Sequence, residues 1–349
     1  MKKIACIIGT RPQLIKHAAL IEELEKYFFV NTINTLQHYS SELNHVLKDE
    51  LYGNKNFCDL SLGLGDLSPA ARLGKMIYEL AIVIDQQKPD AILVYGDTDS
   101  TLAGAITAQK AGIPIIHVES GERSYNKEMP EEMNRVITDY LSQIHFCSSE
   151  ESIDNLKKEK ITNHVFYTGD LMKDLLFSKL NQLADPKIGA YIFCTIHRNY
   201  NKNNPTKLQE LLDSLNGLSM TVMFAVHPST VAAMTTFGID TANYKNIQIL
   251  PPLSYLQSLS SQKYSSAVIT DSGGIQKEAY WLKKPCITIR KETEWKATLT
   301  GNWNQLLYDD LSKLDALLKN TPDTSQYDEQ LYGSGNVSTI ITNALLQLI

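Results

Sequence analysis

The chain has 349 residues, of which 43% are hydrophobic and 21% charged, which argues against disorder and suits two domains of ordinary size. Lys and Arg total 33 against 39 Asp and Glu, and this acidic balance disfavours nucleic acid as a partner. The five cysteines form no CxxC pair, so neither a metal site nor a disulfide framework is expected. Apolar runs are too short for a signal peptide or a membrane span, which predicts a cytoplasmic protein without a membrane partner.

In the first half of the chain, short apolar runs alternate with longer amphipathic segments. The runs are continuously apolar, as in strands of a parallel sheet that helices cover on both faces. The predicted strands are residues 4–8, 31–36, 91–95, 113–118, 144–147 and 164–167. The predicted helices are residues 13–27, 41–51, 68–87, 98–110, 130–141 and 149–158.

The alternation pauses over residues 169–190 and then begins again. The second set of predicted strands is 191–195, 221–226, 247–250, 267–270 and 286–288, and the predicted helices are 205–218, 229–237, 254–263, 274–282 and 311–319. Repeated strand–helix alternation implies right-handed crossovers and parallel sheets. We therefore predict an α/β fold of two Rossmann-like, doubly wound domains, 1–168 and 169–335, with the last helix, 336–349, free to pack on the first.

Polar, glycine-containing motifs follow the predicted strands in both halves. They read GTRPQ, GDTDS, HVESGERS, TIHRN, HPST and DSGG. Ligands of open parallel sheets bind at the carboxyl ends of the strands, so these motifs predict a shared ligand site in a cleft between the two domains. No G-x-G-x-x-G follows the first strand and no Walker motif occurs, which makes a redox dinucleotide or P-loop enzyme a weak interpretation.

Three carboxylates stand out among these motifs. Asp97 and Glu119 each follow a strand, and Glu131 opens the next helix. Carboxylates that share a cleft raise one another's pKa, which suits general acid–base chemistry, and His197 could face them from the second domain. The alternative for Asp97 and Glu131 is helix capping.

The DSGG motif lies between a strand and a helix. Backbone N–H groups at such a helix start suit a phosphate, with Arg11 and His227 as further cations and Glu278 as an acceptor for a ribose diol. The alternative is a simple N-cap followed by a glycine turn. His38, at the end of an early strand, is a further candidate for the cleft.

Taken together, the motifs resemble the non-hydrolysing UDP-N-acetylglucosamine 2-epimerase family. The resemblance runs almost end to end, through GTRPQLIK, YGDTDSTLAG, HVESGERS, MPEEMNR, TIHR, HP and DSGGIQKEA to QLYGSG at 330–335. It implies the GT-B arrangement of two domains, a UDP sugar as the small-molecule partner, no cofactor and a homodimer.

The resemblance also implies a reaction and a set of residues. UDP leaves by anti elimination to a 2-acetamidoglucal and adds back after protonation of C2 on the other face, which provides precursors of surface polysaccharides. The catalytic residues would be Asp97, Glu119, Glu131 and His197. The contacts to substrate or UDP would be Arg11, Lys16, Gln37, His38, Arg135, Arg198, His227, Ser272, Gly273, Gly274 and Glu278.

Several positions depart from the family pattern, and some are similar to the UDP-2,3-diacetamido-2,3-dideoxyglucuronate 2-epimerases. Gln13 stands where Glu is usual, and the QKEA and TEW segments follow that branch. Its substrate carries a carboxylate at C6, for which Lys127, Lys277 and Lys291 are candidate cations, although each is first read as a surface lysine. A hydrolysing epimerase, a GT-B glycosyltransferase and a sugar-nucleotide sensor remain as alternatives.

Overall fold

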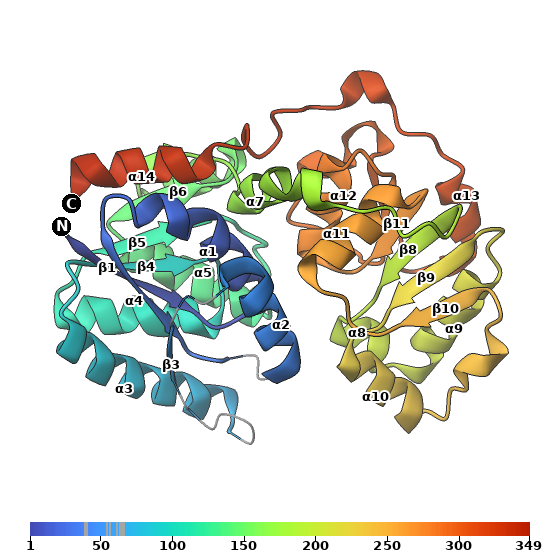
Figure 1. Ribbon diagram of the computed structural model, residues 1–349, viewed down its shortest axis with the longest axis horizontal. Helices are drawn as coiled ribbons and strands as arrows, with labels where there is room; N and C mark the ends of the chain where they lie inside the picture. The colour runs from blue at the N-terminus through green and yellow to red at the C-terminus, as the bar shows by residue number, and fades with distance from the viewer. Residues whose placement is uncertain (38–40, 54, 56, 61, 63–66) are drawn as a thin grey trace. The chain divides into compact units, whose positions relative to one another are not determined.

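The computed structural model describes residues 1–37, 41–53, 55, 57–60, 62 and 67–349, without the side chains of 41–45. It divides into two units (Figure 1): unit 1 comprises Met1–Ser178 and Gln330–Ile349, and unit 2 comprises Lys179–Glu329. His38, one of the predicted contact residues, lies outside the described residues.

Unit 1 is built on a seven-stranded parallel sheet with strand order β3-β2-β1-β4-β5-β6-β7. Its strands are β1 (Lys3–Ile8), β2 (Phe29–Asn34), β3 (Cys58–Asp59), β4 (Ala91–Tyr95), β5 (Ile115–Val118), β6 (Ile144–Cys147) and β7 (Val165–Tyr167). Its helices are α1 (Arg11–Leu24), α2 (Ser41–Tyr52), α3 (Pro69–Gln87), α4 (Asp99–Ala111), α5 (Pro130–Leu141), α6 (Glu150–Lys158), α7 (Leu171–Lys179) and α14 (Val337–Leu348).

Unit 2 repeats the same plan with a six-stranded parallel sheet of order β10-β9-β8-β11-β12-β13. Its strands are β8 (Tyr191–Thr195), β9 (Thr221–Ala225), β10 (Ile247–Leu250), β11 (Ala267–Thr270), β12 (Cys286–Thr288) and β13 (Asn304–Leu306). Its helices are α8 (Asn199–Lys202), α9 (Pro205–Asn216), α10 (Pro228–Thr236), α11 (Tyr255–Tyr264), α12 (Gly273–Trp281) and α13 (Leu314–Leu318). The predicted fold of two Rossmann-like domains is confirmed.

Alternating residues of the strands supply the core on both sheet faces. In unit 1, Ile7 and Val94 pack against Leu80 of α3 and Ala105 of α4. Figure 1 shows these two helices along one face of the sheet and α14 along the other. In unit 2, Cys194 of β8 belongs to the cluster that includes α9 and α10, whereas its neighbour Phe193 packs with α12.

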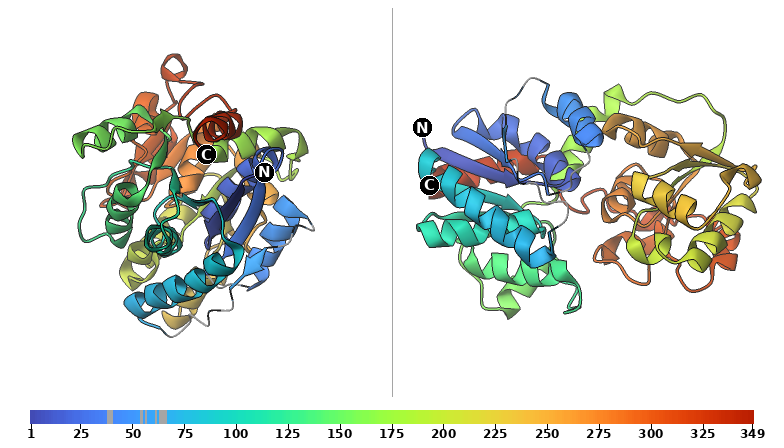
Figure 2. Two further views of the ribbon diagram at one scale, coloured as in Figure 1. Left: turned by 90° about the vertical axis from the view of Figure 1, so that its left-hand side faces the viewer. Right: turned by 90° about the horizontal axis from the view of Figure 1, so that it is seen from below.

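The boundary predicted after residue 168 is wrong in position, because α7 and the 330–335 segment pack together in unit 1. Lys173 of α7 is buried, and its Nζ donates to the carbonyl oxygens of Leu331 (3.1 Å) and Gly333 (2.5 Å). A Cβ on Gly169 would lie 2.5 Å from the carbonyl oxygen of Tyr332, so only glycine allows this approach. The chain then continues into α14, which contacts α1 and brings the C-terminus beside the N-terminus (Figures 1 and 2).

Four strands and helices were not predicted, namely β3, α7, α8 and β13, and the predicted helix 311–319 forms a 3₁₀ turn followed by the short α13. β3 and β13 have only two or three residues and form at the sheet edges. Helix α7 lies in the stretch 169–190, where the alternation of strands and helices pauses, so no neighbouring strand pattern indicated it. These short elements depend on tertiary contacts.

In both sheets, the strand order reverses direction at one point, between β1 and β4 in unit 1 and between β8 and β11 in unit 2. The helices that follow the two central strands lie on opposite faces there, which opens a crevice at the carboxyl ends of the strands. All the polar motifs singled out in the sequence lie at or beside these two points.

The core of unit 1 contains a buried histidine, and its titration predicts an acid-sensitive fold. His17 of α1 contacts the hydroxyls of Tyr95 and Thr32, each at 2.8 Å. Burial, with a smaller contribution from Lys55, lowers the pKa of His17 from 6.5 to about 3. Between these values the unfolded chain binds a proton that the folded chain excludes, so stability falls as the pH drops below 6.5.

We expect His17 to reduce the stability of unit 1 by about 2 kcal/mol between pH 7 and pH 5. Hydrogen exchange of unit 1 amides at the two pH values would measure the change. A His17→Gln variant, which keeps a polar side chain without this titration, should lose less stability than the wild type over the same range. An equal loss in both proteins would contradict the assignment.

Candidate active site

In unit 1, Gln13 joins the loop after β1 to the loop after β4. Its Oε1 accepts hydrogen bonds from the backbone N–H groups of Gly9 (2.8 Å) and Thr10 (3.1 Å). Its Nε2 donates to the carbonyl oxygen of Tyr95 (2.9 Å) and to Oγ1 of Thr98 (2.8 Å). These neighbours include N–H donors and oxygen acceptors, so the side chain between them must both accept and donate. An amide does both, which explains Gln at this position.

The start of α4 is fixed by Gln37. Its Oε1 accepts from the backbone N–H of Ser100 (2.9 Å) and from the Ser100 hydroxyl (2.6 Å). The same hydroxyl lies 2.7 Å from Oγ1 of Thr35. A Cβ on Gly9 would come within 2.1 Å of that Thr35 oxygen, so the loop after β1 requires glycine. Gln37, predicted as a substrate contact, therefore has a structural partner at the sheet edge.

Glu119, at the end of β5, is paired with Lys16 of α1. The Lys16 ammonium forms an ion pair with Oε2 of Glu119. The Lys16 side chain is only 9% exposed and the Glu119 side chain 12%. Glu119 has a φ of +66°, in the left-handed region that side chains with a Cβ rarely adopt. Such strain persists only where surrounding contacts impose it, and it is common at functional sites. A Cβ on Gly96 would lie 3.2 Å from the Glu119 carboxylate, so this carboxylate reaches the turn after β4.

Asp97, in that turn, is held by Arg135 of α5. Nε and Nη2 of Arg135 both donate to Oδ2 of Asp97, at 2.9 and 2.6 Å. The Asp97 side chain is 30% exposed, whereas Arg135 is buried and also donates to Glu132 at 2.9 Å. Asn134 donates to the Asp97 carbonyl oxygen at 2.9 Å. Helix α5 thus fixes both the backbone and one carboxylate oxygen of Asp97.

The two glutamates that open α5 differ in their surroundings. Glu132 is buried and accepts from the backbone N–H groups of Ser124 and Tyr125, both at 2.8 Å. Burial alone would raise the pKa of Glu132, but these N–H groups and Arg135 hold it below its usual value. Glu131 is half-buried, and no hydrogen bond or ion pair joins its carboxylate to the described part of the chain. Of this pair, Glu131 is the one available for chemistry.

The structure therefore places Asp97, Glu119 and Glu131 around one edge of the unit 1 sheet. Lys16 and Arg135, which the resemblance assigned to substrate contacts, are each bound to one of these carboxylates. The sequence pattern predicted the carboxylates as neighbours but did not show their cations. Arg11 is the first residue of α1 and is half-buried at the same edge.

In unit 2, the buried carboxylate of Asp271 organises the loop after β8. It accepts from the backbone N–H groups of His197 (3.0 Å) and Arg198 (2.9 Å) and from Nδ2 of Asn201 (2.9 Å). Nδ1 of His197 lies 3.2 Å from the same carboxylate. Burial would raise the pKa of Asp271, but His197, Asn201 and the Arg198 N–H lower it overall. A buried carboxylate that orients an accessible imidazole suits acid–base chemistry at the other ring nitrogen.

His227 follows the neighbouring strand β9 and caps α10. Its Nδ1 accepts from the backbone N–H of Ser229 at 3.2 Å, and its ring centre lies 6.2 Å from that of His197. The side chain is exposed. The two histidines predicted for the second domain are therefore adjacent at the carboxyl edge of its sheet.

The DSGG segment forms the N-terminus of α12. The Ser272 hydroxyl accepts from the N–H of Ile275 at 3.4 Å. The helix N-cap that the sequence analysis gave as the alternative to a phosphate site is therefore present. A Cβ on Gly273 would lie 3.2 Å from Oε1 of Glu294 and 3.9 Å from Nη1 of Arg290. Gly274 is the next residue of the helix and is half-buried.

Two guanidinium groups near this edge carry N–H groups that are buried without an acceptor among the described residues. They are Nη1 of Arg290, which bonds Glu294 through Nη2 at 2.9 Å, and Nε of Arg198. A buried donor without an acceptor is costly, which points to an anionic ligand. With the N-terminus of α12, these groups could hold a phosphate or diphosphate.

Glu278, predicted as an acceptor for a ribose, lies further along α12. It is buried and accepts from Nε2 of Gln262 at 2.7 Å. The geometry shows a carboxylate in unit 2 that is fixed by Gln262 and lies in the same helix as the DSGG segment.

The three lysines proposed for a sugar carboxylate have different environments. Lys127 is exposed, and Lys291 is exposed at 3.8 Å from Asp309. Lys277 is almost completely buried, with its ammonium 3.4 Å from the ring centre of Trp295. The reading of Lys277 as a surface lysine is wrong, since the QKEA and TEW segments pack together.

Some residues of the site were missed in the sequence. The sequence pattern does not single out Asp271 within DSGG, and it does not single out Arg290, which follows β12 by two residues. His117 lies inside an apolar strand and Asp139 lies inside a helix, so neither stands at the position after a strand that marked the other candidates. The position of a polar residue directly after a buried strand was the available signal for Arg290.

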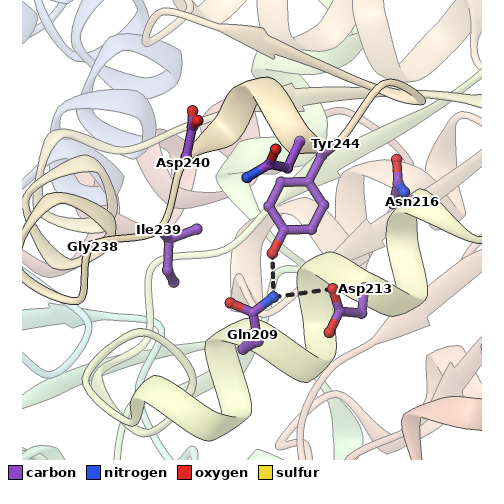
Figure 3. A pocket seen from close by; sticks show the side chains of 8 residues that line it. Gln209, Asp213, Asn216, Gly238, Ile239, Asp240 and Tyr244 are labelled. Carbon is purple, nitrogen blue, oxygen red and sulfur yellow. Dashed lines mark hydrogen bonds between the residues drawn. The ribbon is translucent and has the colours of Figure 1, made fainter.

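A separate pocket of about 300 Å³ lies in unit 2 and is open to solvent (Figure 3). Gln209 and Asp213 of α9 line it together with Tyr244, whose hydroxyl contacts Gln209. The pocket lies where β9 and β10 begin, away from the carboxyl ends that carry His197 and Asp271. It does not take part in the candidate site.

The described residues hold neither a group of metal ligands nor a membrane-spanning helix. No group of three or more His, Cys, Asp or Glu side chains among them is arranged to hold a metal ion. Within the same residues, no helix combines the length and apolar character that crossing a membrane requires.

Comparisons with known proteins agree with this geometry. A family model described as UDP-N-acetylglucosamine 2-epimerase matches residues 22–346. The UDP-N-acetylglucosamine 2-epimerase homolog of Methanococcus maripaludis is 36% identical, over 99% of this chain and all of the relative. The UDP-2,3-diacetamido-2,3-dideoxy-D-glucuronate 2-epimerase of Pseudomonas aeruginosa is also 36% identical, again over 99% of this chain and all of the relative.

Solved structures show the same relationship. The crystal structure of Methanocaldococcus jannaschii UDP-GlcNAc 2-epimerase, in complex with UDP-GlcNAc and UDP, matches with a TM-score of 0.88 and 32% identity over 99% of both chains. The resemblance stated from the motifs is confirmed, including its similarity to the diacetamidoglucuronate branch, and so is the GT-B-type fold. This chain belongs to the UDP-N-acetylglucosamine 2-epimerase family.

Proposed function

We propose that the protein inverts C2 of a UDP-2-acetamido sugar and returns the product as an intact UDP sugar. The observation that carries this proposal is the group of carboxylates, Asp97, Glu119 and Glu131, at the carboxyl edge of the unit 1 sheet. Proton removal and return on two faces of one carbon requires more than one acid–base group. Unit 2 adds the N-terminus of α12 and the donors of Arg198 and Arg290, which suit the diphosphate.

The proposed reaction has two balanced steps. In the first, a base takes the proton from C2, the C2–H electron pair forms the C1=C2 bond, and the C1–O pair leaves with UDP. In the second, the diphosphate oxygen attacks C1 and C2 takes a proton on the opposite face. No electrons are gained or lost overall, so we propose that no redox cofactor takes part. We also propose that protein N–H donors, rather than a metal ion, hold the leaving diphosphate.

Asp97 is the best defined of the proton-transfer groups. Of the two carboxylate oxygens of Asp97, Arg135 binds Oδ2 only. Oδ1 of Asp97 accepts no hydrogen bond from the residues that the structure describes. One oxygen is thus fixed while the other is open to a substrate proton. Lys16 orients Glu119 in a similar way, and His197, oriented by Asp271, is proposed as a further proton-transfer group.

The sugar is proposed to be UDP-N-acetylglucosamine or its 2,3-diacetamido-glucuronate equivalent, since relatives with both names are at least 35% identical. The buried Lys277–Trp295 contact supports the second, because both residues belong to the segments that resemble that branch. The product would serve as a precursor for bacterial surface polysaccharide.

The test is incubation of the purified protein with each UDP sugar in deuterated water, followed by proton NMR. We expect deuterium at C2 of an intact UDP sugar with inverted configuration, and the sugar that reacts identifies the substrate. Accumulation of free UDP and free sugar in equal amounts would overturn the non-hydrolysing proposal. No exchange with either sugar would overturn the proposed substrate class.

We also propose a homodimer in the cytoplasm. All five cysteines are free thiols and four are buried, which suits a reducing compartment. Helix α5 exposes apolar side chains at helical spacing, a feature that an oligomer would cover. These side chains are Met133, Val136, Ile137 and Tyr140. Light scattering should give twice the 39.2 kDa mass of the chain, and the chain mass itself would contradict the dimer.

A further inference from the structure

A buried polar cluster lies directly behind Glu119 and Asp97. We call it the His117 cluster; it comprises His117, Ser120, Arg123, Asp139 and His145, all of which are buried. These residues come from β5, the loop after it, α5 and β6. The acid–base chemistry proposed above makes no direct use of any of them.

Asp139 is the acceptor at the centre of the cluster. Its Oδ1 accepts from the Ser120 hydroxyl (2.5 Å) and from Nδ1 of His117 (2.6 Å). Its Oδ2 accepts from the N–H of Gly121 (3.1 Å) and forms an ion pair with Nη1 of Arg123 (2.7 Å). Burial opposes ionisation, but His117, Arg123 and Ser120 hold the pKa of Asp139 well below its usual range. Asp139 is therefore a carboxylate that contacts three hydrogen-bond donors and one guanidinium, and it has no proton to give.

His117 has an acceptor at each ring nitrogen. Nδ1 faces the Asp139 carboxylate at 2.6 Å, and Nε2 lies 2.7 Å from the carbonyl oxygen of Gly96. Neither oxygen can donate, so a neutral imidazole would direct one lone pair at an acceptor. Both contacts are hydrogen bonds only if both ring nitrogens carry a hydrogen.

We propose that His117 is a buried imidazolium that acts as a positioning residue, joining the Asp97 turn to the Glu119 loop through Asp139. This inference rests on the proposed function for the roles of Asp97 and Glu119. One contact of His117 reaches the turn before Asp97, and the other reaches Asp139, which binds the residues after Glu119.

The charges around His117 balance this cation. Asp139 of α5 and Glu159, after α6, are the negative groups, and Arg123 bridges them, with 2.8 and 2.6 Å bonds to Glu159. With His117 charged, the two cations match the two carboxylates. His145 of β6 faces the cluster through Ser120 (2.9 Å), and burial lowers the pKa of His145 to about 4, so this second ring is neutral at pH 7.

The position of these bonds explains how the cluster acts on the catalytic groups. Gly96 precedes Asp97 in the chain. The carbonyl oxygen of Gly96 contacts Nε2 of His117, and the N–H of Gly96 donates to the carbonyl oxygen of Val118 at 2.9 Å. On the other side, Ser120 and Gly121 follow Glu119 and are tied to Asp139. These bonds oppose relaxation of the unfavourable φ of Glu119.

The first test is the protonation of the His117 ring in the full-length wild-type protein, measured by ¹H–¹⁵N NMR of the imidazoles from pH 6 to pH 9. Loss of signals in His117→Gln identifies the residue. We expect both His117 nitrogens to give protonated-type shifts at pH 7.5, whereas His145 gives one protonated and one unprotonated nitrogen. An unprotonated nitrogen on His117 at that pH would overturn the imidazolium, whatever the enzyme's activity.

The second test is the kinetics of His117→Phe, which removes both hydrogen bonds. We expect kcat for C2 epimerisation to fall about 10- to 100-fold with KM within about threefold, because small displacements of acid–base groups affect the chemical step. Leu80→Ala in α3 is the matched control for loss of buried packing, and its kcat should stay within about twofold once folded protein is counted.

Should His117→Phe fail to fold, His117→Gln, which can donate only from one amide group, replaces it in the same comparison. The positioning role would be overturned if the His117 variant that folds had the same kcat as Leu80→Ala. A wild-type protein that epimerises no UDP sugar would instead contradict the proposed function and leave the NMR result standing as the measure of the charge on His117.

Discussion

Replacing Asp97 with Asn is expected to lower kcat for C2 epimerisation by about 10²- to 10⁴-fold, the usual contribution of a general acid–base group. The amide keeps an oxygen for the Arg135 contacts, so the turn after β4 should keep its shape. What the variant loses is a group able to take up or release a proton. Steady-state kinetics and deuterium incorporation at C2 would both measure the loss.

Asp99→Asn is the matched control for this variant. Asp99 stands two residues later, in the first turn of α4, and accepts from Asn134 at 3.2 Å, a contact that Asn can also make. Its kcat should stay within about twofold of the wild type. Equal loss in both variants would show that charge at this edge matters rather than proton transfer by Asp97, and full activity of Asp97→Asn would remove it from the mechanism.

Replacing Asp271 with Asn is expected to destabilise unit 2 by about 2–3 kcal/mol and to lower kcat about 10- to 100-fold. The buried carboxylate serves three donors besides the His197 ring, and an amide turns one of its oxygens into a donor. One of these N–H groups would then face another N–H in a buried site. His197 would lose the partner that orients it.

The tryptophans allow the effect on unit 2 to be measured separately. Trp281, Trp295 and Trp303 all lie in unit 2, so their fluorescence during urea unfolding reports this unit. Asp240→Asn, at an exposed cap on the opposite edge, is the control and should unfold as the wild type does. An unchanged unfolding midpoint in Asp271→Asn would contradict the structural role of this carboxylate, and unchanged kcat would contradict its role in orienting His197.

The regular elements show why so much of the fold could be predicted. Strands 91–95, 144–147 and 191–195 have the bounds that the apolar runs predicted, because a strand covered on both faces is mostly apolar. The domain boundary was misplaced because α7 and the 330–335 segment lie far apart in the sequence and meet only through contacts such as Lys173 to Gly333. Pattern within a short window carries no information about such a pairing.

The candidate site divides in a similar way. A polar residue directly after a buried strand marks the functional edge of a parallel sheet, and this rule identified Asp97, Glu119, His197 and His227. The rule did not identify which cation binds each carboxylate. The contacts of Lys16 with Glu119 and of Arg135 with Asp97 join residues that lie far apart in the sequence.

For this protein, the sequence alone determined the two doubly wound domains, the family and the edge at which its chemistry-bearing residues gather. Only the tertiary structure decided the partners of Glu119 and Asp97, the burial of Lys277, the buried Nη1 of Arg290 that has no acceptor among the described residues, and the two acceptors of His117. The physical reason is that hydrophobic periodicity is a local property of the chain. Hydrogen bonds and ion pairs depend on ångström-scale distances between residues that only the folded sheet brings together.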